Sequence, residues 1–300
     1  MLTATKTRSR ASAFVALTKP RIIELLLVST VPTMVLAHRG LPSVWLMVAT
    51  VIGGTLSAGG ANAFNMYVDR DIDAVMERTK GRPLVTGEVA PTEALVFAFV
   101  VESVSFFWLW AFVNLLSAVL AVAACAFYVF VYTLWLKRTS TQNIVIGGAA
   151  GAAPVLIGWS AVTNSLAWPA LILFGVVFFW TPPHFWALAI RYEDDYASVD
   201  VPMMPVVAGH RSTARQILAY SIVVWLVTLL LIPVGDMGWI YTIAAMVLGA
   251  FFTGGAVQLL LESDSESLDK RAIRYFAFSI THLTLLFAAV AVDQLVRWGI

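Results

Sequence analysis

The sequence predicts an all-α, polytopic membrane protein, and its composition and its pattern both support this. Hydrophobic residues make up 60% of the 300 residues, charged residues make up 12%, and mean hydropathy is +0.83. These values lie far outside the range of soluble globular domains. The apolar residues also form long runs, and helices satisfy their own backbone groups inside a bilayer.

Nine apolar segments are long enough to cross a hydrocarbon core of about 30 Å as helices. The first segment is short, and Asn114 alone separates the third from the fourth, so the prediction carries a margin of one span. The segments lie at residues 22–38, 43–66, 92–113, 115–135, 142–162, 166–190, 214–234, 238–261 and 273–296.

Lysines and arginines test this number independently, because they gather in cytoplasmic loops. With nine spans and a cytoplasmic N-terminus, 17 of the 19 fall on one side, and only Arg39 and Arg297 fall on the other. Removing one span would scatter later charges onto the wrong side. The net charge of +1 therefore hides a strong charge asymmetry across the membrane.

Residues 1–20 are basic, rich in hydroxyl groups and free of acids. We interpret them as a cytoplasmic tail rather than a mitochondrial transit peptide, since only about twenty residues precede the first span. This interpretation predicts a bacterial inner membrane. The single cysteine, Cys125, lies in an apolar run, which excludes a disulfide framework. We expect residues 1–300 to form one domain.

The first dense cluster of charge follows the second span. Asn65, Asp69 and Asp73 are spaced i, i+4, i+8, so a helix that continues through them would stack all three side chains on one face. Aligned oxygen atoms suit Mg²⁺, which binds carboxylates and phosphate oxygens. A solvated loop has no reason to keep this spacing. Asp71 points the other way, and we expect it to be solvated.

Basic side chains on the same predicted side can hold the far oxygens of a diphosphate. Those that we predict to contact substrate are Lys19, Arg21, Arg78, Lys80, Arg82, Lys137 and Arg138. For Lys19 and Arg21, a role as topological anchors is an equal alternative. The acids and cations together predict a magnesium–diphosphate site at the membrane surface, with residues 67–91 as an active-site loop.

A second acidic cluster follows the sixth span, in a second predicted active-site loop at residues 191–213. The sixth span runs in the same direction as the second, so Glu193, Asp194 and Asp195 reach the same side as the first cluster. Two acidic helix ends on one side are what two magnesium ions bridging one diphosphate would require.

His184 lies in the sixth span, where an ionisable residue is a candidate functional group. Pro182 and Pro183 precede it, and we expect them to break the helix. His184 would then either contact substrate or satisfy a freed backbone carbonyl. His38, His210 and His282 are weaker candidates.

Taken together, the motifs resemble a known family. The pattern N-x-x-x-D-x-x-x-D at 65–73 is similar to the first motif of the UbiA-type intramembrane prenyltransferases. Further strings resemble the heme-prenylating branch: L-T-K-P-R at 17–21, D-I-D-A-V-M-E-R-T at 71–79, R-P-L-V-T-G at 82–87, L-K-R-T at 136–139, Q-N-I-V-I-G-G-A-A-G-A at 142–152, P-H-F-W-A-L-A-I at 183–190 and D-D-Y-A at 194–197.

The resemblance implies nine helices around a central cavity and transfer of a farnesyl group from farnesyl diphosphate to a vinyl group of heme b, giving heme O. It implies Mg²⁺ as cofactor, the lipid bilayer and a heme A synthase or terminal oxidase as partners, and no nucleic acid. We assign catalytic roles to Asn65, Asp69, Asp73 and Asp195. We predict that the same four residues, together with Asp194, bind the metal. We predict that His184, Tyr192 and Tyr196 contact substrate, as do the basic residues named above.

Three features depart from the family's pattern. Its second motif is commonly D-x-x-x-D, but this chain has Tyr192 and Tyr196 in that frame, with Asp194 and Asp195 between them. The tyrosines resemble the heme-prenylating branch, and we prefer Asp195 to Asp194 as a metal ligand. Thr181 stands where the family suggests glutamine, and Asp200 where it suggests glycine.

Two alternatives stay open. One is a prenyltransferase that acts on a quinone precursor or a chlorophyllide, and the other is a cation-coupled membrane transporter. Acids confined to one side, near cations that can hold phosphate, favour the enzyme, because a transport pathway should carry polar groups through the midplane.

Overall fold

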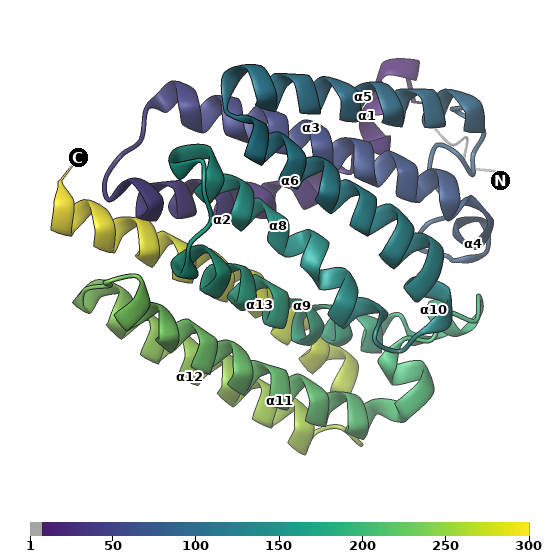
Figure 1. The fold of residues 1–300 in the computed structure, drawn as a ribbon. Helices are drawn as coiled ribbons and strands as arrows, with labels where there is room; N and C mark the ends of the chain where they lie inside the picture. The colour runs from purple at the N-terminus through teal and green to yellow at the C-terminus, as the bar shows by residue number, and fades with distance from the viewer. Residues whose placement is uncertain (1–7, 300) are drawn as a thin grey trace.

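The computed structural model describes residues 8–299, and their side chains apart from those of residues 21–27. In this part of the chain every regular element is a helix, and the long helices lie side by side in a bundle (Figure 1). The elements are α1 (Arg10–Leu17), α2 (Pro20–His38), α3 (Val44–Val68), α4 (Arg70–Val75), α5 (Pro91–Phe112), α6 (Leu115–Ala126), the π-helix η1 (Phe127–Leu136), α7 (Lys137–Thr139), α8 (Asn143–Thr163), α9 (Trp168–Arg191), α10 (Glu193–Ala197), α11 (Met204–Val234), α12 (Trp239–Leu261) and α13 (Leu268–Trp298).

Eight helices of the described residues are long and apolar enough to cross a membrane. They are α3, α5, the continuous helix Leu115–Thr139, α8, α9, α11, α12 and α13. The all-α, multi-pass prediction is therefore confirmed, and these helices coincide with the second to ninth predicted segments. The first segment corresponds to α2. Because α2 contains residues 21–27, whose side chains lie outside the described set, a ninth span stays a prediction.

The predicted boundary at Asn114 is a tight turn between α5 and α6. The Asn114 side chain accepts a hydrogen bond from the Ser117 amide at 2.8 Å, which caps α6. Its Nδ2 donates to the Ser160 carbonyl of α8 at 2.7 Å. The Asn114 side chain therefore caps α6 and also bonds α8. These two hydrogen bonds stabilise the short connection between α5 and α6.

Small residues let α3 and α5 approach closely. A Cβ atom added at Gly53 would lie 2.4 Å from the Leu109 side chain, and one at Gly60 would lie 3.0 Å from Glu102. The Ser105 hydroxyl also donates to the Gly53 carbonyl at 2.8 Å. Close packing of this kind replaces the hydrophobic effect as the main attraction between helices in lipid.

The prediction that Pro182 and Pro183 break the sixth span was wrong, because α9 runs unbroken from Trp168 to Arg191. A bilayer penalises irregular backbone more than the loss of two helical hydrogen bonds, so a membrane helix tolerates internal prolines.

One end of the bundle carries the short elements α1, α4 and α10 (Figure 1). The predicted loops 67–91 and 191–213 are thus partly helical, since they contain α4 and α10. Within the predicted tail, residues 10–17 form α1. In α1, Ala13 and Leu17 are buried, and Arg10 pairs with Glu93 of α5 at 2.5 Å. The C-terminal end of α13 lies at the opposite end of the bundle.

Candidate active site

The first acidic motif is buried where α3 meets α4. Helix α3 ends at Val68, and Asp69 separates it from α4. The helical hydrogen-bond pattern nevertheless continues, because the Asp69 amide donates to the Asn65 carbonyl and the Asp73 amide to the Asp69 carbonyl, both at 2.9 Å. Asn65, Asp69 and Asp73 are only 3%, 0% and 2% exposed. The i, i+4, i+8 spacing therefore places all three in the interior.

A network of donors fixes the orientation of the Asn65 amide. Its Nδ2 donates to Asp69 Oδ2 at 2.7 Å and to the Thr133 hydroxyl at 3.2 Å. Its Oδ1 accepts from Lys19 Nζ at 2.8 Å. Because an ammonium group can only donate, the amide oxygen must face Lys19. In this arrangement Asn65 holds the Asp69 carboxylate in place through its nitrogen.

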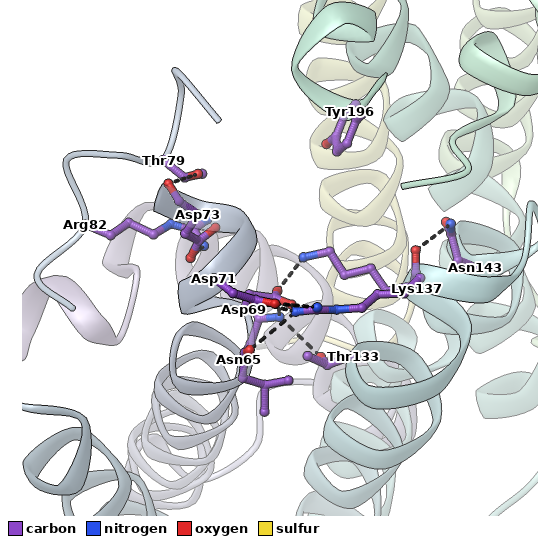
Figure 2. A network of polar contacts seen from close by, with 12 residues as sticks. Asn65, Asp69, Asp71, Asp73, Thr79, Arg82, Thr133, Lys137, Asn143 and Tyr196 are labelled. Carbon is purple, nitrogen blue, oxygen red and sulfur yellow. Dashed lines mark hydrogen bonds and ion pairs between the residues drawn. The ribbon is translucent and has the colours of Figure 1, made fainter. Parts of the chain in front are cut away.

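Lys137 and Arg138 reach the same acids from the end of the fourth predicted span. Lys137 Nζ forms a salt bridge with Asp69, and Figure 2 shows the two side chains pointing toward each other. Arg138 binds both oxygens of the exposed Asp71 at 2.7 Å and lies 3.6 Å from Asp69 Oδ1. Asp71 is exposed, as predicted, but Arg138 links it to Asp69.

The π-helix η1 leads directly into this pair of cations. Its wider turn is visible where the Lys137 amide donates to the Tyr132 carbonyl, five residues earlier, and the Thr133 hydroxyl also donates to the Tyr128 carbonyl at 2.9 Å. A π-helical turn re-aims the side chains that follow it and often occurs at functional sites. Here it brings Thr133 toward Asn65 and is followed at once by Lys137.

Asp73 is held by the loop that follows α4. Arg82 Nη1 bonds Asp73 Oδ2 at 2.5 Å, and the Thr79 hydroxyl donates to the Asp73 carbonyl at 3.1 Å. Lys80, predicted to contact substrate, instead forms an exposed ion pair with Glu77. The loop therefore turns Arg82 toward the acids and leaves Lys80 at the surface.

Lys19 enters the site from the junction between α1 and α2. Its backbone is left-handed, with φ of 51°, and Asn62 Nδ2 of α3 holds the preceding carbonyl, Thr18 O, at 3.0 Å. Burial lowers the pKa of the Lys19 ammonium well below its usual value, and repulsion from Arg82 and Lys137 lowers it further. The side chain of Arg21 lies outside the described residues.

The second motif contacts the loop that follows the first. The Asp195 carboxylate accepts hydrogen bonds from the backbone amides of Glu77 and Arg78 at 3.1 and 3.2 Å. The Arg78 guanidinium lies over the rings of Tyr192 and Tyr196, 5.5 and 5.9 Å from their centroids. The two predicted active-site loops therefore meet, and α10 packs on the loop after α4.

Two observations bear on metal binding. Asp69 Oδ1 is buried and accepts no hydrogen bond, so one carboxylate oxygen of the first motif is available as a ligand. Among the described residues, however, no three His, Cys, Asp or Glu side chains gather closely enough to hold a metal ion. Mg²⁺ commonly takes one or two carboxylates and completes its shell with water and phosphate oxygens. The first motif fits that pattern.

His184 is buried and packs against α13. Its ring stacks between Trp180 and Phe276, with centroids 4.2 and 4.4 Å away, and its Nδ1 lies 2.6 Å from the Ser279 hydroxyl. It therefore bonds a side chain of α13 and not a freed carbonyl. Of the weaker candidates, His210 pairs with Glu193 at 2.5 Å, His282 stacks on Phe252, and His38 is exposed.

Sequence reasoning missed several residues that arrange the site. Asn62 lies one turn before Asn65 on α3, so its helical spacing could have revealed it. Thr133 is a hydroxyl near the end of an apolar span, which is a weaker signal. Asn143, at the start of α8, is fully buried, and its Oδ1 has no hydrogen-bond partner. Figure 2 shows it beside Lys137.

A helical membrane bundle with a buried cluster of acids and cations at one end is suited to an anionic leaving group at the membrane surface. The chain belongs to the UbiA prenyltransferase family, whose model matches residues 26–281. Among curated relatives, the protoheme IX farnesyltransferase of Parafrankia sp. (strain EAN1pec) is 56% identical over 286 residues, covering 95% of this chain and 91% of the relative. Seven further relatives carry the same name at 52–55% identity.

Solved structures show the same fold at low sequence identity. A structure described as digeranylgeranylglyceryl phosphate synthase has a TM-score of 0.76 at 16% identity, covering 95% of this chain and 98% of the other. A UbiA homolog from Archaeoglobus fulgidus bound to DMAPP and Mg²⁺ has a TM-score of 0.65 at 16% identity, covering 93% and 99%.

Proposed function

We propose that this chain transfers the farnesyl group of farnesyl diphosphate to a vinyl group of heme b, giving heme O. The observation that carries the proposal is the 52–56% identity, over about 95% of the chain, to relatives named protoheme IX farnesyltransferase. The likeness extends over all the helices that supply the site, so it supports the same substrates and not merely the same fold.

The buried cations would bind the diphosphate. Lys19, Arg82 and Lys137 already surround the acids of the first motif. A magnesium ion held by Asp69 and Asp73 would neutralise charge on the departing diphosphate, and the homolog bound to DMAPP and Mg²⁺ supports that choice of metal. Preorganised cations stabilise such a leaving group because they need little reorganisation during the reaction.

The bond between the farnesyl C1 and the diphosphate oxygen breaks with both electrons leaving on the oxygen. The vinyl π electrons of heme then form the new carbon–carbon bond, and water adds to the resulting cation with loss of a proton. Apolar residues pack on the membrane side of Asn65: Ala61, Phe64, Cys125, Tyr128 and Val129. This packing would keep water from trapping the first cation early.

The same proposal gives the protein its place in the cell. The excess of Lys and Arg on one predicted side supports a bacterial inner membrane, with the acidic motifs facing the cytoplasm. All 300 residues would form one catalytic domain. The product is a lipid-soluble heme, so a heme A synthase or a terminal oxidase is a suitable consumer.

An acceptor screen tests the proposal. Purified protein in detergent receives farnesyl diphosphate and Mg²⁺ with either heme b or 4-hydroxybenzoate, and mass spectrometry identifies the products. We expect a farnesylated, hydrated heme that is absent from the Asp69→Asn variant. Prenylated benzoate would overturn the acceptor, and no metal-dependent product from either would favour the transporter alternative.

A further inference from the structure

We infer that the second motif, Tyr192–Tyr196, does not hold a second magnesium ion. Instead it positions the basic loop, residues 76–82, so that the Arg78 guanidinium supplies the second positive charge to the diphosphate. This inference rests on the proposed function for its substrate. It follows from the contacts that each polar side chain of the motif makes.

The Asp195 carboxylate is hydrogen-bonded to the backbone of the basic loop. One oxygen of its carboxylate accepts from the Glu77 amide at 3.1 Å and the other from the Arg78 amide at 3.2 Å. Both oxygens are therefore used, at the point where the chain leaves α4. Metal ligation by Asp195 would release these two amides and free the loop that carries Arg78 and Arg82.

The two tyrosines form a clamp for Arg78. They are spaced i, i+4, and the Arg78 guanidinium lies over both rings. Arg78 Nη2 also lies 3.5 Å from the Tyr196 hydroxyl. Aromatic faces attract a guanidinium, and arginine is well suited to bind phosphate oxygens. Neutral phenols, by contrast, are poor magnesium ligands compared with carboxylates.

The basic loop connects the clamp to the first motif. Tyr196 is 5% exposed, and its burial raises the pKa of its hydroxyl, while the nearby positive charges of Arg78 and Arg82 oppose that rise. Arg82 in turn bonds Asp73. The basic loop therefore joins the two motifs, with Arg78 held by the aromatic rings of the second and Arg82 by the Asp73 carboxylate of the first.

The remaining acids of the motif offer no second site. Glu193 pairs with His210 of α11 at 2.5 Å. Asp194 is exposed, and among the described residues its carboxylate bonds no other side chain. A second magnesium ion would have to rely on a solvent-facing carboxylate alone. The structure instead provides one metal-binding motif and one arginine clamp.

Counting bound metal tests the inference directly. Full-length protein in detergent is titrated with Mn²⁺ in the presence of farnesyl thiodiphosphate, an unreactive analogue, and free Mn²⁺ is measured by electron paramagnetic resonance. We expect one ion per chain, one ion in Asp195→Asn and in Asp194→Asn, and none in Asp69→Asn. Two ions in the unmodified protein, with one lost in Asp195→Asn, would overturn the inference.

A second measurement separates a positioning role from a merely structural one. Tyr196→Leu removes an aromatic face, and we expect about tenfold weaker binding of the analogue with the metal count unchanged. Tyr196→Phe should restore the affinity, since the ring is kept. In Asp195→Ala, hydrogen exchange of the amides of residues 76–82 should rise about tenfold. Asp269→Asn, which removes a surface partner of Arg191 at the same end, is the matched control.

Loss of a metal ion in Tyr196→Leu, or unchanged hydrogen exchange in Asp195→Ala, would refute the clamp. Neither measurement needs an acceptor. A protein that binds one ion with the analogue but does not modify heme would refute the proposed function and leave this inference standing.

Discussion

The two acidic stretches at the same end of the bundle look alike in the sequence but are used differently. In the first, Asn65–Asp73, the carboxylates of Asp69 and Asp73 are buried and face cations from other segments. In the second, Tyr192–Tyr196, the acids face backbone amides, a histidine and solvent. Charge alone therefore does not identify a metal site, because burial and partners decide what a carboxylate can bind.

The difference has an energetic meaning. Removing a carboxylate and its partner cation from water costs several kcal/mol per ion, and their attraction seldom repays more than that. Burying Asp69 and Asp73 with their cations therefore adds little to the free energy of unfolding. The burial is instead explained by function, because a buried, preorganised site binds a highly charged ligand strongly.

The largest effect should come from neutralising the buried acids. We expect Asp69→Asn or Asp73→Asn to lower turnover by about 100-fold or more, since each removes a carboxylate proposed to hold the metal. Turnover of heme b with farnesyl diphosphate is the measurement. Gel filtration of the protein, extracted from the membrane in detergent, is the control for folding. Normal turnover would remove that residue from the metal site.

The next effect concerns the buried salt bridge between Lys137 and Asp69. Lys137→Met leaves the buried Asp69 with only the Arg138 guanidinium, at 3.6 Å, as a partner cation, and we expect a loss of about 3 kcal/mol in the free energy of unfolding. The double variant Lys137→Met with Asp69→Asn should recover most of this loss, because no lone charge remains. Thermal unfolding in detergent measures both. A single variant as stable as the parent would show that Asp69 is hydrated.

A smaller effect is expected at His184, whose side-chain hydrogen bond goes to Ser279 and not to either motif. His184→Ala removes the ring stacked between Trp180 and Phe276 and should raise the KM for heme about tenfold, with little change in farnesyl diphosphate binding. Separate titrations of the two substrates measure this. Equal weakening of both would identify His184 as a structural residue.

The smallest effect should come from Asp71, the exposed acid within the first stretch. Asp71→Asn should cost less than about 1 kcal/mol of stability and leave turnover unchanged, because an exposed ion pair is screened by solvent. Hydrogen bonds from Arg138 lower the pKa of Asp71 from 3.8 to about 2.

This shift sets the pH range of the effect. A carboxyl group with a lowered pKa in the folded state stabilises the protein above the unfolded pKa. The contribution of Asp71 is therefore complete above about pH 4 and is lost as pH falls toward about 2. Thermal unfolding of parent and variant should converge over this range. A difference that is undiminished at pH 2 would contradict the assignment.

Local pattern predicted much of the molecule. The apolar runs predicted most membrane helices to within a few residues, as with α9, predicted at 166–190 and observed at Trp168–Arg191, whereas α11 begins at Met204 and was predicted to begin at 214. The i, i+4, i+8 spacing placed Asn65, Asp69 and Asp73 on a common face. Both results follow from helical periodicity, which depends only on neighbours in the chain.

What the sequence determined by itself was therefore the membrane class, the helices and the first motif. Only the tertiary structure decided which charges meet. Lys137 pairs with Asp69 across 68 residues, and Asp195 bonds the Arg78 amide across 117. Such pairings depend on how the helices pack and on which side chains are removed from water. Neither produces a periodic pattern in the sequence. For that reason the sequence did not reveal that Asp195 accepts hydrogen bonds from the Glu77 and Arg78 amides.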